Sequence, residues 1–484
     1  MRSRNRAAVA CVTGAAMLRS IASFALLLGA SVVLRAQEQE GLVHGNHAGT
    51  DAVGLNPARI AGQWCWMDVN IIGADASVWN DHVYLTGRDR SVLEEMRETL
   101  RTGADRLVVN EDPRSGGRHA YVHARLKGPA LAWSSGRNGF GAHISTRAAV
   151  SIGGVGESLA RFAYHGLTYR PQHGIRYADD RLRIVGAAWT EVGGSYARQL
   201  VARDFHRFSA GITARYLIAH TGAGIAFSAL DYTVHDTLQA EVHKATGRYG
   251  TAMPALDAGR GHAFDLGISY ERTLDEADGY VPHTGCDALP YRYRVGLSIV
   301  DIGGLRFRDG YTARFDASTA YFQDYNALEV DGASGLDSLV SASLSTSRAG
   351  TGFRTGLPTA AALQFDHRIT HHVYMAASVV QNLAFGDGLR IRRANTAAFI
   401  PRFEHQRVEF ALPIVVHEYD LRRTAVGAML RLNNVSLGSD DLLPLITRGN
   451  LYGLDLYFRI KWTVFRSPVC RGRRQAQHRP GDCH

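Results

Sequence analysis

Hydrophobic and polar residues alternate with a period of two in several parts of the chain. In the first run, one face holds Phe208, Ala210, Ile212, Ala214, Tyr216 and Ile218, and the other holds Arg207, Ser209, Gly211, Thr213 and Arg215. In the second, one face holds Tyr291, Tyr293, Val295, Leu297 and Ile299, and the other holds Arg292, Arg294, Gly296 and Ser298. In the third, near the end of the chain, one face holds Leu454, Leu456, Phe458, Ile460 and Trp462, and the other holds Gly453, Asp455, Tyr457, Arg459 and Lys461. Such alternation predicts strands with one apolar and one polar face.

The length of these runs indicates which kind of strand they form. Strands of soluble sheets average about 5–6 residues, whereas a tilted strand needs about 9–11 residues to cross a bilayer. All three runs sustain the alternation over roughly the longer span. Charged residues on the polar face suit a water-filled lumen, and Tyr and Trp at strand ends suit interfacial girdles.

The remaining chain supplies more candidate strands and two candidate helices. The strands are expected around 62–72, 128–135, 138–151, 185–201, 222–236, 261–273, 357–369, 372–384, 397–403, 405–417 and 424–436. Turn signals occur at Gly136-Arg137-Asn138-Gly139, His220-Thr221-Gly222 and Ile369-Thr370-His371-His372. Helical spacing is found in Ser91–Arg101 and, more weakly, in Leu336–Leu344. We predict an all-β fold: a single closed antiparallel transmembrane β-barrel of about 14 strands, with one or two small loop helices and a short N-terminal plug-like segment.

Composition agrees with a barrel and argues against a helical membrane protein. The chain has 484 residues, 45% of them hydrophobic, with 51 Gly and 38 Tyr plus Phe. Mean hydropathy is −0.14, because only alternate residues of a barrel face lipid. No window after the leader offers about 18 consecutive apolar residues.

The net charge of +9 does not indicate nucleic-acid binding, because it is concentrated at the two ends. Residues 1–36 hold five arginines and no acid, and residues 466–484 hold five arginines against Asp482. The chain between them is therefore neutral, and no nucleic-acid partner is expected. The basic end could touch anionic lipid head groups, but a solvated, disordered tail is the simpler expectation.

The first residues have the pattern of a secretory signal. Arginines precede an apolar stretch, Ile21 to Leu34, and the small residue Ala36 marks a cleavage point, although Met17 is an alternative start. We expect four regions: a signal peptide at 1–36, a plug-like segment at 37–61, the barrel at 62–465 and a basic tail at 466–484. Export through a signal peptide places the barrel in a Gram-negative outer membrane.

The five cysteines do not indicate a metal site. Cys11 lies in the leader, and Cys65, Cys286, Cys470 and Cys483 lack the C-x-x-C spacing of zinc sites. Export permits disulfides, and Cys470 with Cys483 is one possible pair, but spacing alone establishes none.

The search for chemistry in the chain is mostly negative. No phosphate-binding loop, zinc-protease motif or EF-hand occurs. Gly193-Gly194-Ser195-Tyr196-Ala197 approximates a nucleophile elbow but ends in Ala and lies in a strand-like run. His371-His372 could bind metal, although polar turn residues explain them better. We therefore predict no catalytic, cofactor-binding or metal site, no cofactor and no enzymatic activity.

The candidate functional residues are those expected inside the barrel. The polar residues expected to face the lumen are Glu191, Arg207, Arg215, Arg292, Arg294, Asp455 and Arg459. Glu191 shares a face with Trp189 and could mark a permeation path, but a salt bridge with a lumen arginine is the simpler reading.

Several phrases of the chain resemble known outer-membrane barrels. Leu55-Asn56-Pro57-Ala58 is similar to the start of FadL-like and PorV-like barrels. Further phrases resemble a larger uncharacterised barrel family, known only as a domain of unknown function. They occur in the same order as in that family and extend along nearly the whole chain. The phrases are Gly128-Pro129-Ala130, Gly139-Phe140-Gly141, Ser145-Thr146-Arg147, the run 188–198, the run 211–217, the run 293–303 and Leu357-Pro358-Thr359-Ala360.

The resemblance implies an exported barrel of unknown activity and offers no catalytic residues to transfer. By analogy with FadL-like barrels, whose N-terminal segment plugs the lumen and which pass apolar ligands, Asn56, Pro57 and Ala58 belong to a plug. The chain departs from these barrels by continuing past Phe465 into a basic tail. The expected function is passage or binding of a small molecule, hydrophobic ones included. The alternative is a scaffold for protein secretion or surface attachment, with secretion components as partners.

Overall fold

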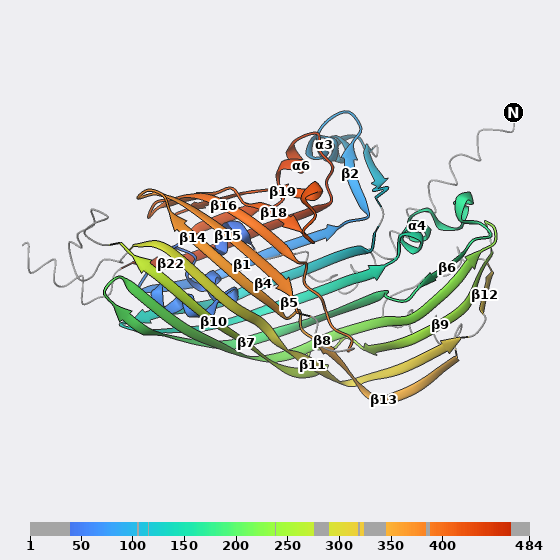
Figure 1. Cartoon of the computed structure of the whole chain (residues 1–484), viewed down its shortest axis with the longest axis horizontal. Helices are drawn as coiled ribbons and strands as arrows, with labels where there is room; N and C mark the ends of the chain where they lie inside the picture. Colours follow the sequence, from blue (N-terminus) through green and yellow to red (C-terminus); the bar gives the residue numbers. More distant parts are fainter. Residues whose placement is uncertain are drawn as a thin grey trace, which may run out of the picture.

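A single sheet closes on itself to form a barrel (Figure 1). The computed structural model describes residues 39–103, 106–114, 116–237, 239–274, 290–317, 320–323, 345–383 and 388–465. Strand β1 (Met67–Asn80) pairs antiparallel with β4 (Arg118–Ser135) on one side and with β22 (Gly453–Val464) on the other, so the sheet has no free edge there. All polar backbone groups of a strand can then be satisfied within the wall.

The wall contains fourteen strands in the described residues, each beside its neighbour in sequence. Eight run unbroken: β1, β4, β5 (Asn138–Val155), β8 (His206–Val234), β15 (Val373–Asn382), β16 (Thr396–Glu404), β21 (Val435–Ser439) and β22. Six are divided by a bulge or short break: β6–β7 (Arg176–Asp179, Arg183–Arg203), β9–β10 (Gln239–Ala252, Gly259–Thr273), β11–β12 (Tyr291–Ala317, Ala320–Gln323), β13–β14 (Ser345–Gly356, Ala360–Arg368), β17–β18 (Val408–Ala411, Ile414–His417) and β19–β20 (Thr424–Val426, Ala428–Leu432). The predicted all-β barrel of about 14 strands is confirmed.

Individual strand predictions were less accurate than the total. The runs at 207–218 and 222–236 form one strand, β8, and the predicted turn at His220-Thr221-Gly222 is wrong. Strand β7 stays paired with β8 through this region, with only a bulge at Ala188/Trp189. Among the wall strands, β6, β9, β12, β13 and β21 were not predicted, and β1 begins at Met67 rather than near 62.

The two ends of the barrel differ in the length of their connections. At one end, the turn end, short turns such as Gly136-Arg137 and 369–372 join the strands, except that residues 274–290 connect β10 to β11. The two predicted turns at this end are confirmed. The opposite end, the loop end, bears longer segments. They contain β2 (Val83–Gly87), β3 (Leu107–Glu111), α3 (Val92–Thr102), α4 (Glu157–His165), α6 (Leu443–Ile446) and the short 3-10 turns η3 (Gly166–Thr168), η4 (Arg170–Gln172) and η7 (Leu421–Arg423). Short turns at one end and long loops at the other are typical of outer-membrane barrels.

Helix α3 matches the helix predicted at Ser91–Arg101. Ser91 accepts a hydrogen bond from the backbone N–H of Glu94, whose side chain accepts one from Ser91 in return, which is a capping box. Helix α4 was not predicted, and the candidate Leu336–Leu344 lies outside the described residues. None of the described helices is long and apolar enough to span a bilayer.

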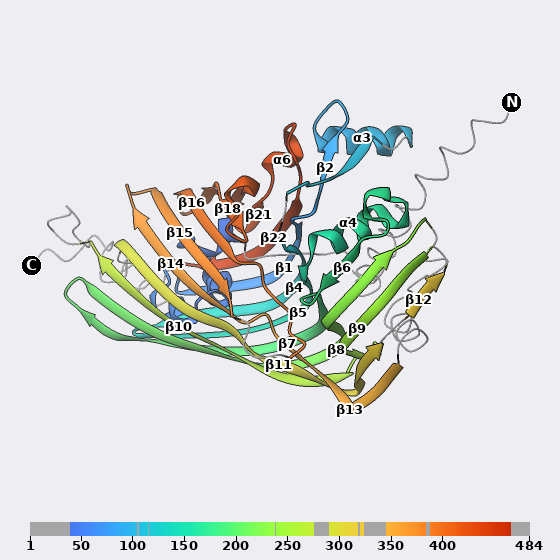
Figure 2. The same ribbon diagram turned by 45° about the vertical axis from the view of Figure 1, so that its right-hand side comes forward.

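The barrel wall is uneven in height. Strands β8 and β11 have 29 and 27 residues, whereas β15 and β16 have 10 and 9. Figures 1 and 2 show that β8, β9, β11 and β13 continue well beyond β14–β16 at the loop end, while α3, β2 and α6 project from the short side. The barrel wall therefore extends farther on one side of its loop-end opening than on the other.

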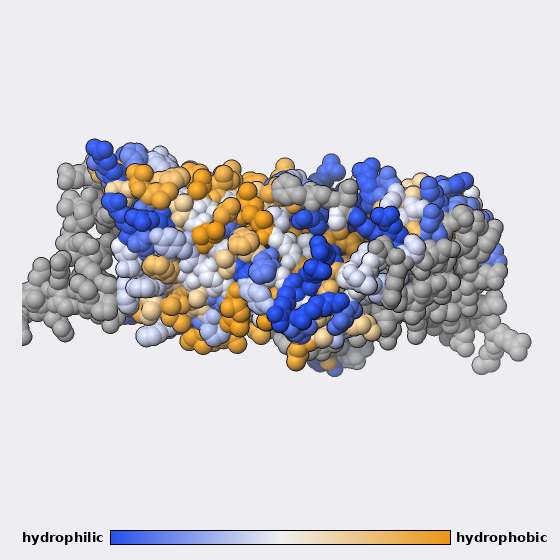
Figure 3. Space-filling view, turned by 90° about the horizontal axis from the view of Figure 1, so that it is seen from below, coloured by the Kyte–Doolittle hydropathy of each residue, from blue (hydrophilic) through white to orange (hydrophobic). Residues whose placement is uncertain are grey.

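The outer face of the wall is apolar around the barrel. Exposed residues alternate with buried ones along each strand, as in β10, and the exposed ones include Ile144, Val192, Ile212, Leu266, Leu297, Leu363, Val379, Phe399, Leu430 and Leu456. Figure 3 shows hydrophobic residues gathered on the surface between more hydrophilic ones. Such a belt on a closed barrel is the surface of a transmembrane β-barrel.

An aromatic girdle runs around the turn end. Trp66, Trp133, Phe140 and Tyr196 contact one another in sequence, with ring centroids 5.5–6.4 Å apart. Tyr270, Tyr293 and Phe365 continue it on β10, β11 and β14, with centroids 6.1 and 6.5 Å apart. Aromatic rings collect at a membrane–water interface, so the girdle marks one edge of the bilayer.

A barrel lumen closed from within

The chain folds back into its own barrel at residues 39–62. This N-terminal segment contains α2 (Glu40–Val43) and the 3-10 turns η1 (Gly49–Gly54) and η2 (Pro57–Gly62), drawn in blue within the wall in Figures 1 and 2. Turn η2 contacts β4, β5, β7, β8 and β10, whereas α2 contacts β16, β20 and β21. The segment therefore crosses the lumen, and nearly all its residues are buried.

Glycines on the inner face of four wall strands make room for this segment. A Cβ atom added at Gly211 of β8 would lie 2.6 Å from backbone atoms of Pro57 and Ala58, and one at Gly139 of β5 would lie 2.6 Å from Ile60. On β10 and β11, Gly267 and Gly296 leave space for Asn56 in the same way. At Gly211 and Gly139, backbone packs against backbone, which only glycine permits, whereas at Gly267 and Gly296 it is the side chain of Asn56 that approaches.

Asn56 fixes the start of η2. Its side-chain oxygen accepts a hydrogen bond from the N–H of Ala58 at 3.0 Å, which caps the turn, and Pro57 occupies the first position, where no donor is needed. Its side-chain NH₂ donates to the carbonyl of Ile268 at 3.0 Å. The three predicted plug residues, Asn56, Pro57 and Ala58, thus lie buried against the barrel wall.

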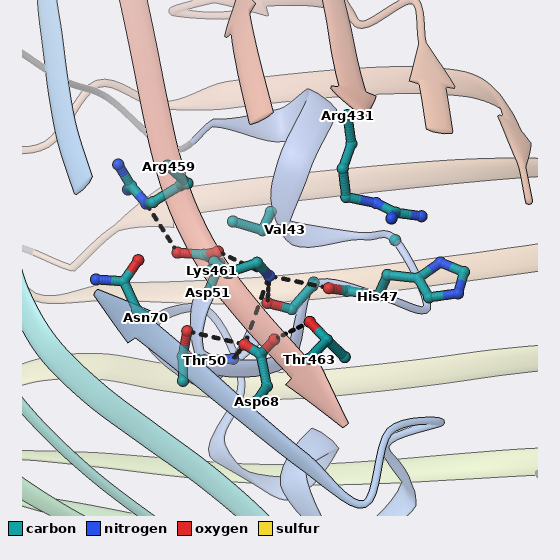
Figure 4. Close-up of polar contacts among 12 residues, drawn as sticks. Val43, His47, Thr50, Asp51, Asp68, Asn70, Arg431, Arg459, Lys461 and Thr463 are labelled. Atoms are coloured by element: carbon teal, nitrogen blue, oxygen red, sulfur yellow. Dashed lines mark hydrogen bonds and ion pairs between the residues drawn. The ribbon is translucent and has the colours of Figure 1, made fainter. Parts of the chain in front are cut away.

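Buried charges bind the middle of the segment to the wall (Figure 4). Asp51 lies 2.7 Å from the ammonium of Lys127, 3.0 Å from the guanidinium of Arg459 and 3.3 Å from the ammonium of Lys461. Burial alone would raise the pKa of Asp51, but these cations hold it well below its usual value. The carboxylate is therefore ionised and tied to β4 and β22.

Lys461 and Asp68 complete this cluster. The ammonium of Lys461 donates to the carbonyls of His47 and Ala48 at 2.9 and 2.7 Å, and Asp68 accepts from the backbone N–H of Thr50 at 2.9 Å. Thr463 donates to the other oxygen of Asp68 at 2.7 Å. Losing one partner would leave a buried charge unmatched, at a cost of about 3–5 kcal/mol.

A second cluster surrounds Arg59 near the turn end. Arg59 donates to the carbonyls of His44 and Gly45 at 3.1 and 3.0 Å, and so holds the segment in a closed loop. Burial, together with the nearby charge of Arg294, lowers the pKa of Arg59 to about 9. Beside it, Asp366 accepts from Arg294 at 2.8 Å and from Arg402 at 2.6 Å.

A third cluster crosses the lumen on the loop-end side of η2. Asp301 lies 2.8 Å from both Arg147 and Arg215 and 3.7 Å from Arg393, and Arg215 also pairs with Glu191 at 3.2 Å and with Asp265. Asp301 has a left-handed backbone (φ 58°) at a bulge between β10 and β11. Five wall strands thus meet in one ionic layer.

The lumen becomes apolar beyond this layer. Trp189, Leu305, Phe307 and Phe353 are 2% exposed or less and pack with Leu217 and Leu357. The rings of Phe307 and Phe353 stack at 5.2 Å beside Gly222 and Gly250, where a Cβ atom would collide with them. The lumens of aqueous porins are polar, so this inner lining is unusual for a water channel.

The connection between β15 and β16 covers this apolar region. Leu389 and Ile391 belong to the same cluster, and the N–H of Arg392 donates to Ser151 at 2.9 Å. The guanidinium of Arg393 reaches Asp301 of the ionic layer. The lumen is thus closed by residues 39–62 from one side and by residues 388–394 from the other.

The predicted lumen residues lie in different surroundings. Glu191, Arg215, Arg294, Asp455 and Arg459 are 0–8% exposed. All of them belong to the three polar clusters except Asp455, which accepts a hydrogen bond from Ser439 at 2.9 Å. Arg207 is half-buried near the turn end, and Arg292 is exposed, because a bulge beside it turns Tyr291 inward instead. Sequence reasoning did not select Asp51, Asp68, Lys127, Asp301, Asp366 or Lys461 as site residues.

Other candidate groups have ordinary surroundings. Ser195 lies within β7 and exchanges a 2.7 Å hydrogen bond with Thr213. His371 and His372 lie in a turn, and His372 bonds to the carbonyl of Glu404. No group of three or more His, Cys, Asp or Glu in the described part is arranged to hold a metal. Cys65 is a buried free thiol, whereas Cys11, Cys286, Cys470 and Cys483 lie outside the described residues.

Three comparisons place the chain among known proteins. Residues 115–440 match the family model described as "Family of unknown function (DUF5723)". No curated protein sequence matches the chain. Among solved structures, the toluene transporter TbuX of Ralstonia pickettii is 11% identical with a TM-score of 0.38, covering 87% of this chain and 95% of its own. A FadL homologue of Pseudomonas aeruginosa is 10% identical with a TM-score of 0.37, covering 89% and 98%.

The family match is the decisive comparison, because it extends over about two thirds of the chain and includes strands from β4 to β21. It agrees with the resemblance predicted from the run of phrases between Gly128 and Ala360. The chain therefore belongs to the family of unknown function DUF5723.

Proposed function

We propose that this protein is an outer-membrane barrel that binds and passes a small apolar molecule. Its place in the outer membrane is supported by the closed barrel, the apolar belt, the girdle and the short turns at one end. Export through a signal peptide at 1–36 and a basic tail at 466–484 belong to the same proposal. No enzymatic step is included in it.

The observation that supports an apolar ligand is the change in the lumen lining. The lumens of barrels that pass ions or sugars are polar and filled with water. Here Trp189, Phe307 and Phe353 line the loop-end half, beneath residues 388–394. Ligand sites are commonly apolar clefts with a few placed polar groups, and the ionic layer with Asp301 supplies those groups below the rings. The connection 388–394 must move to admit a ligand.

Binding of a neutral naphthylamine dye to the purified protein in detergent tests this proposal. We expect the dye to bind, and we expect Phe307→Ser with Phe353→Ser to weaken binding at least about tenfold, because two aromatic contacts are removed. Phe365→Ser is the matched control, because Phe365 is 45% exposed on the outer face. Dye binding that is absent, or unchanged in the double variant, would reject an apolar lumen site.

Liposome swelling separates this proposal from a general porin. With both closures in place, liposomes containing the protein should not swell in small sugars. The alternative of a scaffold for secretion or surface attachment has no specific observation in its favour among the described residues.

A further inference from the structure

The apolar side of helix α3 becomes exposed toward the end of the helix. Val92, Met96 and Leu100 are spaced four residues apart, so they share one side of it. Val92 is 1% exposed, Met96 is 39% exposed and Leu100 is 86% exposed. A surface helix normally buries its apolar side against the rest of the protein. Nothing in the part of the chain that the structure describes covers the outer half of this one.

Neighbouring elements extend this exposed surface toward the barrel wall. Helix α3 contacts α6, and α6 contacts β19. Leu443 and Ile446 of α6 are exposed as well, and Leu421 of η7, three residues before β19, is 79% exposed. We call the five residues Met96, Leu100, Leu421, Leu443 and Ile446 the apolar overhang. Exposed apolar residues gathered in this way mark an interaction surface.

The apolar overhang lies at the loop-end limit of the short wall. Figures 1 and 2 show α3, β2 and α6 rising from the side of the barrel, just beyond the ends of β16 and β18, rather than continuing along the strands. Their position places these elements at the level where the short strands leave the bilayer.

The outer face of the wall changes from apolar to polar at this level. On β15, Val379 is exposed, and the next residue on the same face toward the loop end is the polar Gln381. The side chain of Gln381 accepts a hydrogen bond of 2.7 Å from the hydroxyl of Tyr419, which is exposed and lies two residues before Leu421. A tyrosine above the last apolar residue of a strand is typical of a membrane–water interface. The apolar overhang therefore begins at the lipid surface.

Arginines accompany the apolar overhang. Arg97 on α3, Arg422 in η7 and Arg448 after α6 are exposed, and none of them forms an ion pair with an acid among the described residues. Arginine binds phosphate oxygens with two parallel hydrogen bonds. Apolar side chains on one side and basic ones beside them are the pattern of helices that lie in a membrane interface.

We propose that the apolar overhang lies in the outer leaflet of the membrane, with its side chains among the lipid chains and the accompanying arginines at the level of the phosphate groups. The outer leaflet is the one concerned because the long loops of such barrels face the outside. A second copy of this chain or a soluble partner is the competing occupant. Lipid is favoured because the apolar overhang joins the apolar belt of the barrel at Tyr419. The inference rests on the proposed membrane placement but not on the ligand.

Nitroxide labels measured by electron paramagnetic resonance test this inference on the full chain in liposomes of phosphatidylethanolamine and phosphatidylglycerol. One label is attached per protein, through Leu100→Cys or Ile446→Cys, after all native cysteines except the buried Cys65 have been replaced by serine. Power saturation compares the collisions of the label with oxygen, which concentrates in lipid, and with a nickel chelate, which stays in water.

We expect both labels to show an oxygen-to-nickel collision ratio at least about threefold higher than the matched control Arg101→Cys, because the apolar side of an interfacial helix enters the lipid by about 5–10 Å. Arg101 is the next residue of α3 after Leu100 and is exposed on a different side of the helix. A further label at Phe399→Cys, on the apolar belt, reports whether the barrel itself has inserted.

The Phe399 label separates failure of this inference from failure of the proposed membrane placement. If that label is in lipid while Leu100→Cys and Ile446→Cys are as open to the nickel chelate as Arg101→Cys, the apolar overhang stands in water and this inference alone is overturned. A Phe399 label open to the nickel chelate overturns both. Few collisions with either reagent at Leu100→Cys overturn the inference in favour of a protein partner, and dipolar coupling between labels would identify that partner as a second copy.

Discussion

At the scale of single residues, the lumen depends on positions whose roles become visible only when distant strands meet. Gly211 lies on the predicted polar face of its strand, but only the fold shows that Pro57 and Ala58 press against it. Lys461 also lies on a predicted polar face, yet its partners belong to a segment more than 400 residues earlier. Alternation indicates the face of a residue, but not the group opposite it.

The close packing at Gly211 gives a first prediction. Gly211→Ala should destabilise the barrel by about 1–3 kcal/mol, because the added methyl group meets backbone atoms that cannot rotate away. Gly194→Ala on β7 is the control, because nothing lies within 4 Å of its Cβ position. Thermal unfolding followed by circular dichroism measures the stability of both variants. Equal midpoint temperatures for the two would contradict close packing of the N-terminal segment against Gly211.

The ionised state of Asp51 gives a second prediction, in pH. Its pKa is depressed in the folded state, so its contribution to stability is complete above the unfolded value of about 3.9. The contribution is lost only as pH falls below that value toward the folded pKa. Protease protection of residues 39–62 should therefore persist at pH 5 and weaken in stronger acid for the wild type, whereas Asp51→Asn should be less protected already at pH 7. Identical protection of the two proteins at pH 7 would contradict this role.

At the scale of elements, sustained alternation predicted most strands but not their limits. Runs at 207–218 and 222–236 were separated at His220-Thr221-Gly222, because a Gly beside polar residues has the composition of a turn. In the structure, continued pairing with β7 outweighs that local preference. Strand β21 has only five residues, too few for a period to be recognised, and α4 lies in a loop where tertiary contacts decide.

The N-terminal segment behaves as one element held by wall cations, which gives a third prediction. Lys461→Met should expose residues 39–62 to protease, because it leaves Asp51 and Asp68 less compensated and frees the carbonyls of His47 and Ala48. Lys244→Met is the matched control at an exposed position of β9. Limited proteolysis in detergent measures this exposure. Equal cleavage of the two variants would argue against the role of Lys461 in holding residues 39–62 inside the barrel.

At the scale of the whole molecule, the closed wall, the apolar belt and the filled lumen together explain the alternation of apolar and polar residues along the strands. The polar faces of the strands do not line open water; they bind a buried segment and one another. Residues 37–465, whose net charge is zero, can therefore bury many charged side chains, because nearly every one named here lies beside an opposite charge or a backbone partner. The periodicity of the sequence predicted the barrel, and the Asn56-Pro57-Ala58 phrase suggested the plug. Which charged side chains pair with one another could be seen only in the folded structure.

The ion conductance of the protein in planar lipid bilayers tests most directly whether its own N-terminal segment closes the barrel. The wild-type protein and a variant lacking only residues 388–394 should insert without opening steady channels. A variant lacking both residues 39–62 and residues 388–394 should conduct, with heat-modifiable gel mobility confirming that its barrel has folded. Stable, porin-sized conductance from the wild-type protein would contradict the account.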